Sequence, residues 1–146
     1  MSNLLQKSEE NYKTANWAVK KEFFSVAISR QYYCMFQNLL NFLITTPKEP
    51  YTLQELKDWQ RSTSEFKGSH GSTFRYFNEE LQKSTKIQNW EKVKAINFLK
   101  SFRALRNTSD YTNDKIEEKD WNTSRGYFEY IEKVIGLLKK ELKEND

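Results

Sequence analysis

The stretch RALRNTSDY at residues 103–111 brings together the side chains of this sequence that are best suited to chemistry. It holds two arginines, a short polar segment, an acid and a tyrosine. Leu99 and Phe102 precede Arg106 by seven and four residues, so on a helix the three side chains project from the same side. Arg106 is therefore expected at the edge of a core. A guanidinium there keeps its proton and needs a carboxylate, a phosphate or another acceptor.

Two interpretations of Arg106 follow from its neighbours. In the structural one, Arg106 and Asp110 form an i,i+4 ion pair that finishes the helix, with Tyr111 packed beneath. In the functional one, Arg106 belongs to an anion or nucleic-acid site to which Arg103 and Lys100 add positive charge. Paired charges mark structural networks as well as functional sites, so the sequence leaves both open.

His70, between Ser69 and Gly71, is the only histidine of the chain. It falls in the segment 61–73, which we expect to be a loop leading into a helix. A lone histidine is usually a hydrogen-bonding or capping residue, and by itself it does not make a metal site. Its ordinary pKa near neutrality nevertheless makes it a candidate for proton transfer.

Apolar spacing predicts helices that would carry these residues, and no strand-like alternation is present. The fold class is therefore all-α, in a single domain spanning residues 1–146. The second helix, with the widest apolar stripe, should be the most buried element. Trp90 and Val93 are expected to face inward on the helix that leads to Arg106, and a turn over 107–116 should follow it. Helices are predicted over about 3–20, 25–44, 52–59, 89–106 and 118–144. A further helix is expected after the loop at 61–73, with Phe74, Phe77 and Leu81 facing inward.

The net charge is +4, and the basic excess peaks just before the arginine motif. Residues 76–109 carry seven basic and three acidic side chains, whereas residues 110–146 carry seven and ten. This gradient is compatible with nucleic acid or nucleotide as a partner, although lysines on helices are commonly only a solvated face. Cys34 is the only cysteine, which excludes intramolecular disulfides and cysteine-rich metal sites. No metal or cofactor is expected.

The N-terminus lacks the basic-then-apolar pattern of a signal peptide, and no apolar run is long enough to span a membrane. We therefore expect a cytoplasmic protein with no membrane partner.

Three stretches together resemble the HEPN-domain family. AISRQYYCMFQNLL at 27–40 resembles the helix in which that family has a tyrosine pair followed by an apolar run. SHGSTFRYF at 69–77 is similar to a histidine-glycine segment of one branch, and LRNTSDY at 105–111 to that branch's arginine, spacer and aspartate-tyrosine. Their order and separations also agree. The resemblance covers nearly the whole chain except 45–67.

The resemblance implies an antiparallel up-and-down bundle of four to five helices that commonly dimerises. It also implies a role in prokaryotic toxin–antitoxin or phage-defence systems, often beside a small nucleotidyltransferase. Active relatives are metal-independent ribonucleases that use an arginine followed by a histidine after a short spacer. Here Arg106 matches the arginine, but Tyr111 stands after the four-residue spacer. A phenol of ordinary pKa is a poor general base at neutral pH.

Three functional hypotheses follow. The preferred one is a HEPN-type module that binds nucleotide, RNA or a partner protein through Arg106, Arg103 and nearby lysines without turnover. The second is a metal-independent endoribonuclease toxin that uses Arg106 with His70 or Tyr111. The third is a purely structural dimeric interaction protein in which Arg106 and Asp110 lock the helix.

Overall fold

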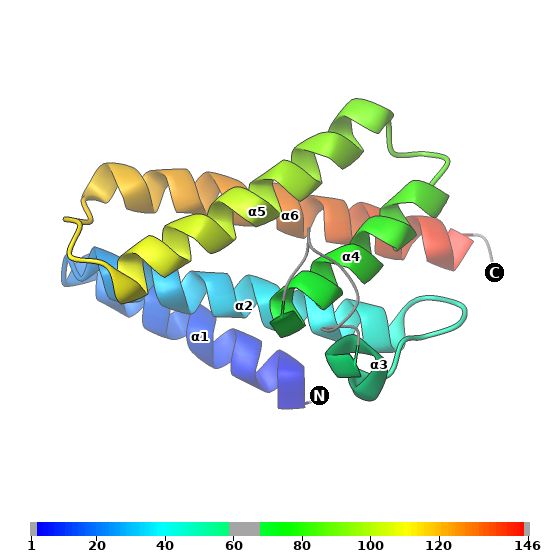
Figure 1. Ribbon diagram of the computed structural model, residues 1–146, viewed down its shortest axis with the longest axis horizontal. Coiled ribbons are helices and arrows are strands. Elements are labelled where there is room, and N and C mark those ends of the chain that lie inside the picture. Colours follow the sequence, from blue (N-terminus) through cyan, green and yellow to red (C-terminus); the bar gives the residue numbers. More distant parts are fainter. Residues whose placement is uncertain (1–2, 59–67, 145–146) are drawn as a thin grey trace.

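The computed structural model describes residues 3–58 and 68–144 (Figure 1). This part of the chain forms helices and no strand, which confirms the all-α prediction. None of the helices in the described ranges is long and apolar enough to cross a bilayer. Five longer helices make up the bundle and α3 is a short addition. The elements are α1 (Asn3–Lys20), α2 (Phe24–Thr45), α3 (Leu53–Asp58), α4 (Gly68–Lys83), α5 (Asn89–Tyr111) and α6 (Glu118–Glu144).

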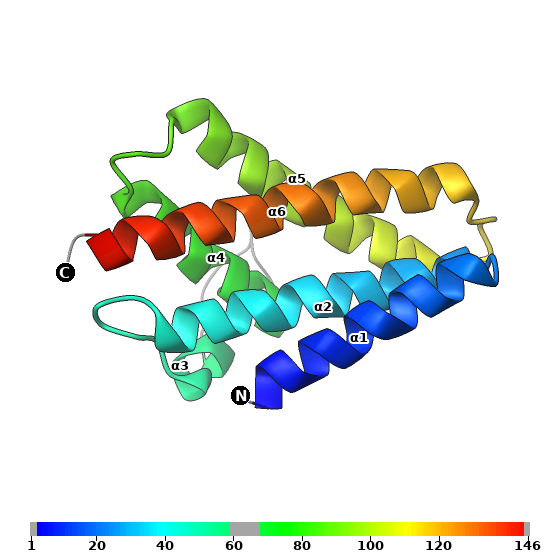
Figure 2. The same ribbon diagram turned by 180° about the vertical axis from the view of Figure 1, so that it is seen from behind.

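Helix α2 lies at the centre of the bundle, as its apolar stripe predicted. It packs against α1, α4, α5 and α6. Figures 1 and 2 show α1 running back along α2, with α6 on another side of α2 and α5 crossing α6 obliquely. Ile28, Met35, Leu39 and Leu43 of α2 are fully buried, because their spacing keeps them on one side of the helix.

A polar network attaches α1 to α2 and α6. The Ser8 hydroxyl donates to Asn38 Oδ1 at 2.5 Å, and Asn38 Nδ2 donates to Glu132 Oε1 at 2.9 Å. Ser8 Oγ also lies 3.3 Å from Cys34 Sγ. Burial raises the pKa of the Glu132 carboxyl, and it raises the pKa of the Cys34 thiol to about 11. The thiol is therefore uncharged at neutral pH.

The predicted loop over 61–73 is wrong at its C-terminal end, because α4 already begins at Gly68. Residues 61–67, like Trp59 of the predicted short helix, lie outside the described residues. Glycine, serine and threonine have weak helix propensity, but here tertiary packing overrides it. Ser72 and Thr73 are buried, and the Ser72 hydroxyl donates to the carbonyl of Leu56 in α3. His70 consequently projects from the first turn of a helix.

The predicted turn directly after Arg106 is also wrong, because α5 continues to Tyr111. The polar residues do not break the helix, since their hydroxyls bond to carbonyls within it. Thr108 Oγ1 donates to Ala104 O at 3.1 Å, and Ser109 Oγ donates to Leu105 O at 3.0 Å. The extra turn keeps Asp110 and Tyr111 on the same helix as Arg106.

The beginning of α5 presents a different face from the one we predicted. Trp90 and Val93 are 61% and 60% exposed, whereas Lys92 is buried and donates from Nζ to Ser84 O at 2.8 Å. The buried stripe therefore runs through Lys92, Ala95, Leu99, Phe102 and Arg106, again at helical spacing. A lysine can occupy such a stripe because its long alkyl stem is apolar and its ammonium reaches a carbonyl.

Candidate functional site

Arg106 lies on α5 where this helix packs against α2, and only 6% of its surface is exposed. The prediction that it lies at the edge of the core is confirmed. Its guanidinium carbon is 4.9 Å from the centre of the Tyr32 ring and 5.4 Å from the centre of the Tyr33 ring. Ring faces carry partial negative charge, so both tyrosines offset part of the cost of burying this cation.

The polar partners of Arg106 satisfy it incompletely. Its Nη1 lies 3.7 Å from Asp110 Oδ2, an ion-pair distance that is too long for a good hydrogen bond. Nη1 also donates to the Tyr111 hydroxyl oxygen at 3.5 Å, at the limit for such a bond. Its Nε is buried and has no hydrogen-bond partner among the described residues. The guanidinium therefore retains capacity to bind an acceptor.

The last turn of α5 orients both of these partners. Ser29 of α2 donates from Oγ to Asp110 Oδ2 at 3.2 Å, which fixes the carboxylate against α2. Tyr111 is 74% exposed, so the expectation that it packs beneath the ion pair is wrong. Tyr111 is the last residue of α5, and the centre of its ring lies 5.8 Å from the guanidinium carbon of Arg106.

His70 reaches the same place from α4. Its Nδ1 lies 2.5 Å from the Tyr32 hydroxyl oxygen, and its ring stacks on Phe36 with 4.0 Å between the ring centres. Burial, reinforced by the positive charges of Arg106 and Arg103, lowers the pKa of His70 to about 4. The imidazole is therefore neutral at physiological pH.

Tyr32 is the residue that joins the two candidate groups. Arg106 contacts the face of its ring, and His70 contacts its hydroxyl. Burial raises the pKa of Tyr32, so its phenol also stays protonated at neutral pH. Tyr32 belongs to the tyrosine pair of residues 27–40, but its sequence context did not predict that it is part of the site. The available signal was its hydroxyl, since a buried tyrosine needs a polar partner.

The remaining predicted residues, Arg103 and Lys100, precede Arg106 on α5. Arg103 is half-buried and its charge acts on both His70 and Tyr32. Lys100 is exposed and lies six residues before Arg106, which is about 9 Å along a helix axis. The structure thus assembles Arg106, Asp110 and Tyr111 from α5 with His70 from α4, and leaves Lys100 at the periphery.

The arrangement combines a permanent cation with two neutral hydrogen-bonding side chains. Arg106 is a permanent cation with unused hydrogen-bonding capacity. His70 and Tyr32 are neutral, and neither has a pKa near 7. In the described ranges, no group of three or more histidine, cysteine, aspartate or glutamate side chains could hold a metal ion.

Comparisons of the chain with protein-family models, with curated proteins and with solved structures found no match. The HEPN resemblance of residues 27–40, 69–77 and 105–111 therefore stays a prediction from the residues themselves.

Proposed function

We propose that this chain is a HEPN-type module that binds the phosphate of a nucleotide or of RNA through Arg106 and does not turn it over. The observation that carries the proposal is the state of the buried Arg106 guanidinium: among the described residues, its Nε has no hydrogen-bond partner and its Nη1 makes only long contacts. A buried cation in this state is costly unless an acceptor completes it. Phosphate oxygens match the planar donors of arginine.

The pKa values of the neighbouring groups support binding without turnover. RNA cleavage requires one group to take the 2′-hydroxyl proton and another to protonate the leaving oxygen. With a pKa of about 4, His70 is a weak base and is almost never an acid at neutral pH. Burial keeps the Tyr32 phenol from ionising, and Tyr111 stands where active relatives carry histidine.

One observation favours a metal-independent endoribonuclease as the second candidate. His70 and Arg106 come from different helices and both contact Tyr32, so a phosphate-binding group and an imidazole lie close together. This candidate predicts RNA cleavage in the presence of EDTA that is lost in Arg106→Ala and in His70→Ala. Wild-type cleavage of this kind would replace the binding proposal. Tyr111→His tests the same point by restoring the residue type of active relatives.

The decisive experiment for the binding proposal compares two variants. Arg106→Ala should weaken the binding of a short RNA or nucleotide about 10- to 100-fold, since hydrogen bonds to charged groups contribute about 1.5–3 kcal/mol. Lys13→Ala is the matched control, because it removes one positive charge from an exposed ion pair on α1. Equal loss in both variants would reduce the effect to net charge and contradict the proposal.

Asp110→Ala separates the binding site from a structural lock. If Arg106 serves a phosphate, removing the competing carboxylate should leave binding intact or strengthen it. If the Arg106–Asp110 pair is a lock, Asp110→Ala and Arg106→Ala should both lower thermal stability, with no RNA or nucleotide bound at low salt. Fluorescence anisotropy and thermal unfolding measure the two outcomes.

The same resemblance supports a biological setting for the module. We propose a role in a prokaryotic toxin–antitoxin or phage-defence system, with a homodimer as the assembly and a small nucleotidyltransferase as a partner protein. Sedimentation velocity tests the assembly directly. A monomer alone at micromolar concentration would contradict the homodimer.

A further inference from the structure

Tyr111 is an exposed aromatic side chain beside the guanidinium of Arg106. The residue is 74% exposed, more than any other large hydrophobic residue in the described part of the chain. Its hydroxyl oxygen accepts a hydrogen bond from Arg106 Nη1 at 3.5 Å, and its ring centre lies 5.8 Å from the guanidinium carbon. Burial of apolar surface stabilises a fold, and this ring contributes little of it. Its surface is therefore left open for a ligand bound at Arg106.

The two other tyrosines beside Arg106 differ from Tyr111 in having their rings packed within the protein. Tyr32 is fully buried, and its ring stacks on that of His70 with 5.5 Å between the ring centres. Tyr33 is half-buried, and its ring packs edge-on against those of Tyr32 and His70 at 5.6 and 6.0 Å. Of these three tyrosines, Tyr111 is the one whose ring is mainly exposed.

Hydrogen bonds on both sides of Tyr111 fix the position of its backbone. Before it, the Asp110 carboxylate accepts a hydrogen bond from Ser29 Oγ of α2 at 3.2 Å. After it, Thr112 Oγ1 donates to Thr108 O at 2.8 Å, which holds the chain against the last turn of α5. Tyr111 is thus the last residue of a helix that is attached to its neighbour. A backbone placed in this way loses little freedom when a ligand binds, which favours affinity.

The 5.8 Å between the Arg106 guanidinium carbon and the Tyr111 ring centre limits which ligands can use both groups. A single molecule must carry a flat aromatic group directly beside its phosphate. A nucleotide has this form, because one ribose joins its phosphate to its base. Nucleobases stack on aromatic side chains, and this stacking adds affinity for every base. A sugar phosphate lacks the flat group, and in a duplex the faces of the bases are covered by neighbouring bases.

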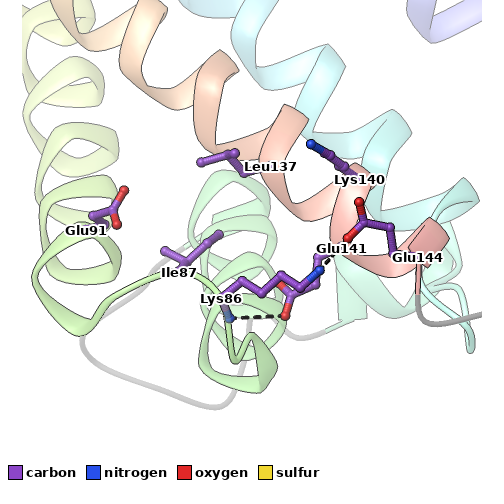
Figure 3. Close-up of a pocket in the computed structure, with 7 residues that line it drawn as sticks. All are labelled: Lys86, Ile87, Glu91, Leu137, Lys140, Glu141 and Glu144. Carbon is purple, nitrogen blue, oxygen red and sulfur yellow. Dashed lines mark hydrogen bonds and ion pairs between the residues drawn. The ribbon is translucent and has the colours of Figure 1, made fainter.

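A pocket of about 310 Å³ at the C-terminal half of α6 is less suited to a nucleotide (Figure 3). Among the described residues that line it, none is aromatic. The lining carries the two ammonium groups of Lys86 and Lys140 and three carboxylates, those of Glu91, Glu141 and Glu144. Despite its burial, hydrogen bonds from the loop after α4 hold the pKa of Glu141 below its usual range. The excess of negative charge disfavours a phosphate in this pocket.

We infer that Tyr111 is the platform on which a nucleobase stacks while Arg106 binds the adjacent phosphate. The ligand is then a phosphate linked to an unpaired base, in a free nucleotide or in single-stranded RNA. This inference rests on the proposed phosphate binding at Arg106. Because every base has a π-face, we expect the site to accept all four bases. Stacking uses the face of the ring and not its hydroxyl, so Tyr111→Phe preserves it.

A matched pair of ligands tests the platform, because AMP carries a base that ribose 5-phosphate lacks. The full chain is titrated with each compound, and nuclear magnetic resonance follows the protein amides and the adenine protons. AMP should bind about tenfold more tightly, with its adenine protons shifted upfield by the ring of Tyr111. Equal binding of the two compounds through Arg106 would overturn the inference and leave the phosphate proposal standing. Binding of neither, or undiminished binding of both in Arg106→Ala, would contradict the phosphate proposal and this inference with it.

Substitutions of Tyr111 assign the effect to its ring. In Tyr111→Leu the advantage of AMP over ribose 5-phosphate should disappear, whereas Tyr111→Phe should keep it together with the upfield shifts. Trp90→Leu is the matched control, because it removes an exposed aromatic ring at the other end of α5 and should keep the full advantage. Both positions are exposed, so thermal stability should stay near that of wild type. A retained advantage in Tyr111→Leu, or its loss in Tyr111→Phe, would overturn the inference.

The length of the ligand separates its two sources. If the site takes single-stranded RNA, a ten-nucleotide single strand should bind at least about tenfold more tightly than AMP at the same salt concentration, because its further phosphates add contacts to basic side chains. If the site takes a free nucleotide, the two affinities should be similar. Either result agrees with an unpaired base on Tyr111. An RNA duplex that binds as tightly as the single strand would overturn the inference.

Discussion

Acidification should destabilise this protein through His70. The imidazole is stacked on Phe36, hydrogen-bonded to Tyr32 and close enough to Arg106 and Arg103 to be affected by their charges. Protonating it places a third positive charge in this partly buried site. The unfolded chain has no such penalty, so protons bind more tightly to the unfolded state.

The size of this effect follows from the two pKa values of His70. Its ordinary value is 6.5 and its value in the folded protein is about 4. Between these values the unfolded state binds more protons, so the free energy of unfolding falls as the pH falls. The contribution is fully present above pH 6.5 and is lost as the pH falls through about 4. At 1.36 kcal/mol per pKa unit it amounts to about 3 kcal/mol at most, because His70 is not completely buried.

Urea unfolding between neutral and acid pH measures this loss, and His70→Phe isolates it from the titration of carboxylates. Phenylalanine keeps an aromatic ring beside Phe36 but does not titrate, so its stability deficit relative to wild type should shrink as the pH falls. Because His70 is the only histidine, its proton resonance gives the pKa without assignment. A value near 6.5, or a pH-independent difference between the two proteins, would refute this reasoning.

Three further predictions concern the core. Glu132→Gln should stabilise the protein at neutral pH and lose this advantage near pH 4.5. Burial raises the pKa of the Glu132 carboxyl, so its ionisation at higher pH favours unfolding. Urea titration at both pH values measures the difference. Cys34, with a pKa of about 11, should react with a thiol reagent only at the rate of unfolding, and rapid reaction in the native protein would argue against its burial. Met35→Asp should abolish the folded circular dichroism signal, because an unpaired buried charge costs several kcal/mol, comparable to the stability of a whole domain.

The local sequence pattern predicted most of the helices. The last helix was predicted over 118–144, and α6 has these bounds, because its apolar spacing, its acidic first turn and its basic last turn agree. The inward positions Phe74, Phe77 and Leu81 of α4 are buried for the same reason. Consistent local signals of this kind need little information from the rest of the fold.

The errors fall where tertiary contacts outweigh local preference. Gly68–Thr73 reads as a loop, yet it is helical because Ser72 bonds to α3 and His70 stacks on α2. The sequence spacing predicts Trp90 and Val93 as core residues, yet both are exposed. The buried side of α5 passes through Lys92 instead. Hydrophobicity alone does not tell which side of a helix its neighbours cover.

The candidate site also combines features that the sequence predicts with features that only tertiary packing produces. The sequence by itself determined that Arg106 lies at the edge of the core, because Leu99 and Phe102 occupy the same side of one helix. Only the tertiary structure decided that His70 and Arg106 meet at Tyr32, since the three residues belong to α4, α5 and α2. Helical periodicity specifies which residues share a face of one helix. The packing of separate helices decides which faces meet, and it also decides the pKa values that burial and neighbouring charges produce.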